Sequence, residues 1–218
     1  MRFLSKLGLA RVAPPRRYAE DLSSTAPMDR FLATAQHLPA SARVVEFGTR
    51  QSKSGHSTHM HHALPNIPRA NYLMTDVQDG EDVDVTADLH ALPRDWAGRF
   101  DAVIALAVFE HLERPWIAAA EVSRILAPGG VGYIQTHQTF PLHGYPSDFF
   151  RFSREALSLI FADAKLRVVE AAYLHRADIV PPTAIVPTTD VLAWNDLFPS
   201  YLSVHVFVEK APATPGDT

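Results

Sequence analysis

Seven consecutive apolar residues, Ala102 to Val108, constrain the fold of this chain more than any other feature. A strand with one wet face alternates apolar and polar residues, whereas a continuous apolar run is typical of a strand covered on both faces. Other short β-branched runs recur along the chain, and helical stretches separate several of them. The pattern predicts an α/β fold with a doubly wound, largely parallel sheet and helices on both of its faces.

The individual elements follow from local patterns. Pro115 suits the first turn of a helix, because its missing N–H needs no partner there. Ser153 can cap the next helix, and Pro128-Gly129-Gly130 is expected to stop the helix before it. Strands are predicted at 43–47, 70–77, 100–108, 131–135, 166–170 and 202–208, with a short further one at 85–89, and helices at 57–63, 116–126 and 153–164.

The ends of the chain differ from this regular pattern. Residues 1–40 are predicted to form a helical flank, and residues 41–210 the main domain. Within that domain, 179–200 is rich in proline yet apolar, which predicts an insertion that serves as a lid or an interface. Residues 211–218 are expected to be a disordered tail.

Composition excludes several classes of function. The chain has 218 residues, with 20 Lys and Arg against 24 Asp and Glu, so the net charge of −4 disfavours nucleic-acid binding. It has no cysteine, which rules out disulfides, thiolate nucleophiles and Cys-ligated metals. No apolar run is long enough to cross a membrane, and the basic N-terminus lacks a signal-peptide core. We therefore expect a cytoplasmic protein with no membrane insertion.

In an open α/β sheet, ligands bind beyond the carboxyl ends of the strands. Gly48 follows the first predicted strand, where a missing Cβ lets the backbone approach a cofactor. Asp76 ends the second strand and can accept hydrogen bonds from ribose hydroxyls, and Asp88 can accept one from an adenine amino group. The first loop lacks a full GxGxxG, which argues against a dinucleotide. An NAD-dependent oxidoreductase nevertheless stays open as an alternative.

The chain from about 43 to 210 resembles a class I S-adenosylmethionine-dependent methyltransferase of the small-molecule type. The resemblance rests on an acidic strand end, Asp76, and on four motifs: VVEFG at 44–48, DLHALP at 88–93, FDAVIALAVFEHL at 100–112 and RILAPGG at 124–130. The stretch HGYPSDFFRFSREAL at 143–157 further resembles a subgroup associated with glycan biosynthesis.

This resemblance implies a Rossmann-like sheet of seven strands in the order 3-2-1-4-5-7-6, with the last strand antiparallel. It implies S-adenosylmethionine as the cofactor, bound by Glu46, Gly48, Thr49, Asp76, Asp88, Leu89, Leu106 and Ala107. The chain departs from the usual E/DxGxGxG loop, because Arg50 and Ser52 replace its second and third glycines. A non-catalytic S-adenosylmethionine-binding or scaffold protein is therefore an alternative.

The resemblance also implies methyl transfer, which needs a residue to deprotonate a hydroxyl acceptor. We expect O-methylation of a sugar-containing or other small hydroxylated acceptor, such as a saccharide or a nucleotide sugar. His143 is the preferred base, since histidine titrates near neutral pH, and His111 after the central strand is the second candidate. Asp148 is expected to orient His143, while Tyr145 and Arg151 are expected to bind the acceptor.

A group of four histidines, His56, His59, His61 and His62, suggests a metal at first sight. Only His59 and His62 share one face of a helix, and no carboxylate lies beside them in the sequence. A solvated helix face is the preferred interpretation, and no metal site is expected.

Overall fold

The computed structural model describes residues 21–51, 56–144, 147–179, 195 and 197–214. Its α-helices are α1 (Ala26–Ala35), α2 (Pro115–Ile125) and α3 (Arg154–Asp163). Its strands are β1 (Val44–Phe47), β2 (Tyr72–Asp76), β3 (Val85–Thr86), β4 (Phe100–Leu106), β5 (Leu126–His137), β6 (Arg167–Ala177) and β7 (Ser200–Glu209). Short 3-10 helices are η2 (His61–Ala63), η3 (Arg69–Asn71), η4 (Arg94–Trp96) and η5 (Phe109–His111).

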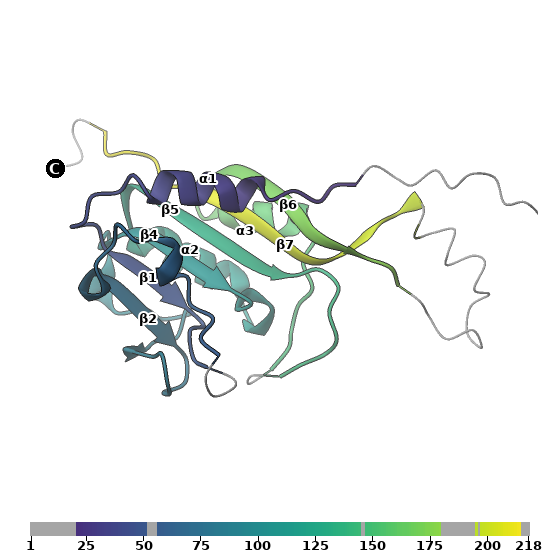
Figure 1. Cartoon of the computed structure of the whole chain (residues 1–218), viewed down its shortest axis with the longest axis horizontal. Coiled ribbons are helices and arrows are strands. Elements are labelled where there is room, and N and C mark those ends of the chain that lie inside the picture. The colour runs from purple at the N-terminus through teal and green to yellow at the C-terminus, as the bar shows by residue number, and fades with distance from the viewer. Residues whose placement is uncertain (1–20, 52–55, 145–146, 180–194, 196, 215–218) are drawn as a thin grey trace, which may run out of the picture. The chain divides into compact units, whose positions relative to one another are not determined.

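The strands form one seven-stranded sheet in the order β3-β2-β1-β4-β5-β7-β6 (Figure 1). Strands β1 to β5 pair in parallel, whereas β7 runs antiparallel to β5. The predicted strand order and the antiparallel last strand are confirmed. The carboxyl ends of β1, β2, β4 and β5 consequently lie at one edge of the sheet, where the predicted site residues follow them.

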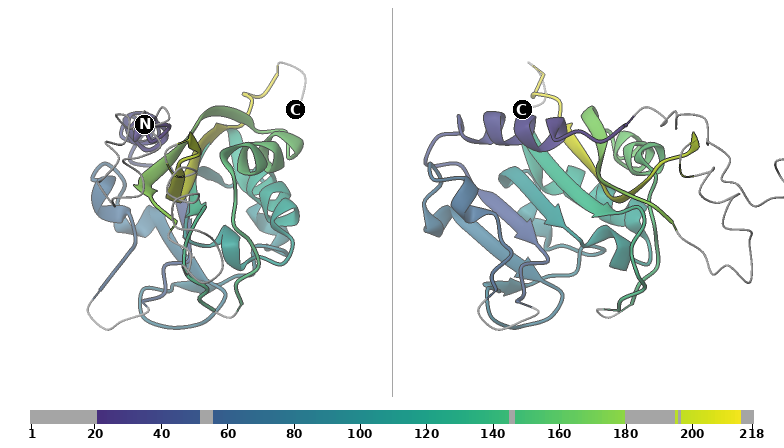
Figure 2. Two further views of the ribbon diagram at one scale, coloured as in Figure 1. Left: turned by 90° about the vertical axis from the view of Figure 1, so that its right-hand side faces the viewer. Right: turned by 45° about the vertical axis from the view of Figure 1, so that its right-hand side comes forward.

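Both faces of the sheet are covered, as the long apolar run predicted. Alternate residues of β4 enter two separate cores: Val103 and Ala105 pack on the side of α2 and α3, while Ala102 and Ile104 pack on the side of α1. Figure 2 shows α1 on one side of the strands and α2 and α3 on the other. On the α1 side the ring of Phe31 stacks on Tyr133, with centroids 5.5 Å apart.

The helix ends agree with the sequence in two places and differ in a third. Pro115 begins α2, and the Ser153 hydroxyl accepts a hydrogen bond from Ala156 N at the start of α3, as predicted. Helix α2 ends at Ile125, however, before the Pro-Gly-Gly turn that was expected to stop it. Gly129 does adopt the left-handed conformation, with a φ of 79°, but within the irregular start of β5.

The predicted helix at 57–63 is wrong in its extent, because only His61–Ala63 is helical among the described residues there, and only as a 3-10 turn. The predicted helical flank contains α1, while residues 1–20 lie outside the described residues. Most of the predicted 179–200 insertion and the end of the 211–218 tail also lie outside them. No helix among the described residues is long and apolar enough to cross a membrane.

Contacts along the chain group it into two units. The larger unit comprises 22–175 and 201–218 and contains the sheet edge with the predicted site. The smaller comprises 1–21 and 176–200. Within the smaller unit, the Asn195 side-chain amide donates to Ile179 O at 2.8 Å.

Candidate functional site

The loop after β1 is held tightly against its neighbours. Gly48 has a φ of 79°, and a Cβ at this position would lie 2.4 Å from Val108 Cγ2. Gly48 N donates to Thr75 O at 2.8 Å, and the buried Thr49 hydroxyl donates to Asp82 O at 2.6 Å. The chain here therefore needs glycine both for its conformation and for its approach to the end of β4.

Glu46 lies in β1 with its carboxyl group buried. Its Oε2 accepts hydrogen bonds from Met60 N at 2.8 Å and from the Tyr72 hydroxyl. Burial raises the pKa of Glu46 to about 7, although both hydrogen bonds act to lower it. This predicted cofactor residue therefore has two protein partners in the structure.

The two predicted aspartates lie at the same edge of the sheet. Asp76 ends β2, is partly exposed, and accepts Gln78 N at 2.9 Å through Oδ1. Asp88 is exposed and accepts both the backbone N–H and the ring nitrogen of His90. Burial alone would raise the pKa of Asp88, but these hydrogen bonds lower it overall. Beside it, Leu89 is buried in the core.

The end of β4 turns sharply away from the sheet. Leu106 is the last strand residue, and Ala107 is exposed with a φ of 51°, a conformation that residues other than glycine rarely adopt. The strained turn leads directly into η5, which carries Glu110 and His111. The predicted cofactor residues Leu106 and Ala107 thus lie next to the group described below.

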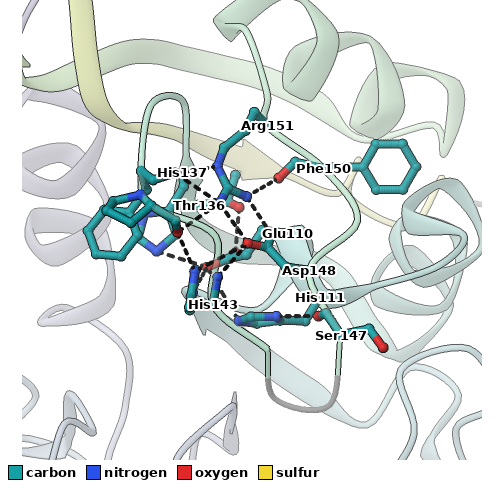
Figure 3. Close-up of polar contacts among 11 residues, drawn as sticks. Glu110, His111, Thr136, His137, His143, Ser147, Asp148, Phe150 and Arg151 are labelled. Carbon is teal, nitrogen blue, oxygen red and sulfur yellow. Dashed lines mark hydrogen bonds and ion pairs between the residues drawn. The ribbon is translucent and has the colours of Figure 1, made fainter. Parts of the chain in front are cut away.

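A cluster of three imidazoles surrounds the carboxyl group of Glu110 (Figure 3). Glu110 is fully buried, and its Oε2 accepts the Thr136 hydroxyl at 2.6 Å. The Nε2 atoms of three histidines face the other oxygen, Oε1, at 3.1 Å for His137, 3.8 Å for His111 and 3.9 Å for His143. We call Glu110, His111, His137 and His143 the histidine cluster.

The loop after β5 is fixed to η5 by its backbone. The backbone carbonyl of Glu110 accepts hydrogen bonds from Phe149 N at 2.8 Å and Phe150 N at 3.1 Å. Phe152 N donates to His137 O at 2.9 Å. These bonds hold the segments after β4 and β5 next to each other. Backbone hydrogen bonds, and not only side-chain contacts, therefore fix the histidine cluster.

Hydrogen bonds at the outer nitrogens fix the protonation of two rings. His111 Nδ1 lies 2.6 Å from Ser147 O, and His143 Nδ1 lies 3.1 Å from Pro141 O. A carbonyl oxygen only accepts, so each Nδ1 carries a proton. In the neutral ring the Nε2 of His111 and of His143 then presents a lone pair.

Asp148 and Arg151 form a bidentate ion pair at 2.5 and 2.7 Å. The Arg151 hydrogen bonds hold the pKa of Asp148 far below its usual range. Asp148 Oδ2 accepts His143 N at 2.9 Å and lies 3.4 Å from His143 Nδ1, so it contacts the ring that it was expected to orient. Arg151 also donates to Phe140 O. Its guanidinium therefore makes hydrogen bonds within the loop.

Sequence reasoning left two members of the cluster without a role. Glu110 stood in the FEHL motif beside a chosen histidine, and His137 followed the strand predicted at 131–135, so both lay near the strand ends where a site is expected. What the sequence did not show is that the β5 end and η5 meet. Tyr145, predicted to bind the acceptor, lies outside the described residues.

The other group of histidines does not share a helix face. The ring of His61 packs at a tilt against Tyr72 with centroids 4.7 Å apart, and its Nε2 contacts Ile67 O at 2.9 Å. His62 is exposed and contacts His59 O through Nδ1. The expected solvated helix is thus replaced by a short turn with local hydrogen bonds.

Comparisons with known proteins agree with this fold. Residues 51–134 match the family model described as a methyltransferase domain. A putative methyltransferase of Bacillus halodurans is similar in structure, with a TM-score of 0.60, 12% identity, and coverage of 84% of this chain and 98% of that one. No curated protein matches this chain at a significant level.

Two further solved structures are similar over most of their length. One is the putative methyltransferase of Haloferax volcanii in complex with the Trm112 methyltransferase activator, with a TM-score of 0.54, 22% identity, and coverage of 87% of this chain and 90% of that one. The other is a Burkholderia thailandensis N1-methyltransferase with bound 1,6-didemethyltoxoflavin and S-adenosylhomocysteine, with a TM-score of 0.56, 14% identity, and coverage of 88% and 80%.

Proposed function

We propose that this chain, a methyltransferase with S-adenosylmethionine as its cofactor, methylates the oxygen of a small hydroxylated acceptor. The observation that carries the proposal is the histidine cluster at the carboxyl ends of β4 and β5. It lies directly after Leu106 and Ala107, two of the proposed cofactor residues. Saccharides and nucleotide sugars are the acceptor class that we propose.

The residues at the sheet edge fit the cofactor. Gly48 has no side chain where the loop comes closest to the end of β4. Among the described residues, Asp76 accepts a hydrogen bond only through Oδ1, so its Oδ2 is available to a ribose hydroxyl. Asp76 would hold the ribose, Asp88 and Leu89 the adenine, and Leu106 and Ala107 the side of the cofactor. When bound, S-adenosylmethionine supplies a methyl group activated on a sulfonium.

The histidine cluster can take the proton that an acceptor hydroxyl must lose. His143 is 27% exposed, and in the neutral ring its Nε2 lone pair can accept that proton as the acceptor oxygen bonds to the methyl carbon. The resulting imidazolium lies 3.9 Å from Glu110 Oε1 and 3.4 Å from Asp148 Oδ2. Both carboxyl groups stabilise a positive ring. Asp148 therefore orients the base and stabilises its protonated form. His111 is the second candidate for the same step.

Substitution of His143 tests proton removal from the acceptor separately from cofactor binding. We expect His143→Gln to slow methyl transfer by about 100-fold or more, in the range that general bases contribute. Binding of S-adenosylmethionine, measured by calorimetry, should stay unchanged in this variant, whereas Asp76→Ala should abolish it. Transfer is measured as release of S-adenosylhomocysteine with a panel of saccharide and nucleotide-sugar acceptors.

The matched control is His37→Gln, which changes an exposed histidine of the segment after α1. It should leave both binding and transfer as in the native protein. A normal rate in His143→Gln would refute the base assignment alone. Absence of turnover with every acceptor in the panel would refute the proposed acceptor class, and absence of cofactor binding would refute the proposed function.

A further inference from the structure

The Glu110 carboxyl group has an oxygen that the described residues leave unsatisfied. Oε1 is buried and has no hydrogen-bond partner among them, although His137 Nε2 lies only 3.1 Å away. The contact has the distance of a hydrogen bond without its alignment. Nδ1 of His137 is also buried without a partner among the described residues. A buried polar atom without a partner is costly and usually has a specific reason.

The protonation of the histidine rings makes the unsatisfied oxygen of Glu110 less favourable still. Carbonyl oxygens of Ser147 and Pro141 place the ring protons of His111 and His143 on Nδ1. When both rings are neutral, two Nε2 lone pairs therefore face the same carboxyl oxygen at 3.8 and 3.9 Å. A lone pair and a carboxylate oxygen repel each other, so the centre of the cluster favours a positive charge between them.

We propose that Glu110, His137 and His143 bind a divalent metal cation of the Zn²⁺ type at the centre of the histidine cluster. One ligand atom from each of the three residues lies within 4.8 Å of the other two. Figure 3 shows these side chains converging from η5, the end of β5 and the following loop. Two imidazoles and one carboxylate are a ligand set used by catalytic zinc sites, which keep a further position open.

The distances fit such an ion. Zinc bonds of about 2.0–2.2 Å in a tetrahedral arrangement separate neighbouring ligand atoms by roughly 3.4 Å. The observed separations from Glu110 Oε1, 3.1 Å to His137 and 3.9 Å to His143, lie on either side of that value. Nitrogen ligands favour Zn²⁺, Co²⁺ or Ni²⁺, whereas Mg²⁺ and Ca²⁺ prefer sites made of oxygen.

The surroundings also have the features of a metal site. Histidine ligands commonly donate their outer N–H to a carbonyl or a carboxylate, which fixes the ring and makes the inner nitrogen more basic. His143 Nδ1 lies 3.1 Å from Pro141 O and 3.4 Å from Asp148 Oδ2. The second oxygen of Glu110 is held by the Thr136 hydroxyl at 2.6 Å. Two of the three ligands are therefore oriented by outer contacts.

This proposal rests on the cluster alone and does not depend on methyl transfer. The cation and an acceptor proton would both use the Nε2 lone pair of His143. A loaded site therefore excludes the metal-free base described above.

The test uses the full chain after removal of metals with EDTA, without S-adenosylmethionine or acceptor. Titration with Zn²⁺ in a calorimeter should show one site, and Co²⁺ should give a visible absorption band at one equivalent. We expect Glu110→Gln and His143→Gln each to weaken Zn²⁺ binding by more than about 100-fold. Asp148→Asn, which removes an outer contact, should weaken it by about 10-fold.

Controls separate the site from other histidines of the chain. His37→Gln should bind Zn²⁺ with native affinity, and Mg²⁺ should produce no heat with any form. Far-ultraviolet circular dichroism of each variant checks that the fold is retained. If the native chain binds no Zn²⁺, or if folded Glu110→Gln and His143→Gln bind it with native affinity, the proposed site is refuted. Neither result bears on methyl transfer, because no transfer is measured.

Discussion

At the scale of single residues, two buried glutamates, Glu46 in β1 and Glu110 in η5, are stabilised in different ways. Glu46 receives two hydrogen bonds on one oxygen, and burial raises its pKa to about 7. Glu110 receives one from Thr136 and faces imidazole nitrogens with its other oxygen. Glu46 avoids a buried charge by staying protonated. Glu110 is surrounded by imidazole rings, which can carry a positive charge themselves or bind a cation.

Glu46 should make the stability of the protein depend on pH. Its folded pKa of about 7 lies above the ordinary value of 4.5, so its contribution is fully present below pH 4.5 and is lost as pH rises towards 7. The loss is about 3 kcal/mol at most. Urea unfolding between pH 4.5 and 8 should show this decline relative to Glu46→Gln, which cannot ionise. Parallel pH profiles for the two proteins would contradict the prediction.

Some residue roles were readable from the sequence because they depend on near neighbours. The cap at Ser153 and the helix start at Pro115 need only local geometry, and both are confirmed. The role of Glu110 was not readable. Its partners Thr136 and His137 belong to β5, and local sequence patterns do not predict which strand ends lie next to each other.

At the scale of elements, the loop after β1 and the end of β4 depend on each other. The left-handed backbone of Gly48 lies against Val108, just after the strained Ala107. The sequence predicted glycine here for access by a cofactor. The structure adds a packing reason, since any side chain would displace Val108 and with it the turn into η5.

Gly48→Ala should therefore destabilise the protein more than the same change at a comparable glycine. Gly129 has the same φ of 79°, but a Cβ added there would meet nothing within 4 Å, so Gly129→Ala reports backbone strain alone. We expect about 1 kcal/mol from that strain and a total of about 2–3 kcal/mol for Gly48→Ala. Urea unfolding measures both, and adding Val108→Ala should recover part of the Gly48 loss. Equal losses at the two glycines would contradict the packing argument.

Element boundaries were predicted less well than element types. The Pro-Gly-Gly turn was expected to end α2, yet α2 ends at Ile125 and the chain pairs with β4 at Leu126 before the turn. Likewise β4 was predicted to reach Val108, but it ends at Leu106 because the chain turns at Ala107. Pairing with β4 decides where α2 ends, and the turn at Ala107 decides where β4 ends. Neither can be predicted from the segment alone.

At the scale of the whole molecule, the strand order was predictable only through the resemblance of the motifs to a known family. Hydrophobic runs such as Ala102 to Val108 establish a covered sheet, and they cannot order its strands. Once the order is known, the two strand ends that carry Glu110 and His137 become neighbours. The histidine cluster is thus a consequence of topology, which explains why it combines residues far apart in the sequence.

The proposed metal and the proposed base predict a measurable competition. Saturating Zn²⁺ should slow methyl transfer by about 100-fold, because it occupies the Nε2 lone pair of His143. EDTA should restore the rate. His137→Gln removes a ligand and keeps His143, so this variant should transfer methyl groups with little sensitivity to Zn²⁺. A rate that rises with Zn²⁺ in the native chain would contradict the competition.

The position of β7 between β5 and β6 has a consequence for synthesis on the ribosome. Residues 200–209 complete the sheet, and they also reach the beginning of the larger unit, where the Tyr201 hydroxyl accepts Leu22 N at 2.7 Å. Until these residues emerge, a nascent chain exposes β5 and β6 as unpaired strand edges, which are prone to pair with other chains. The sheet therefore stays incomplete, with edges that favour aggregation, until residues 200–209 have left the ribosome.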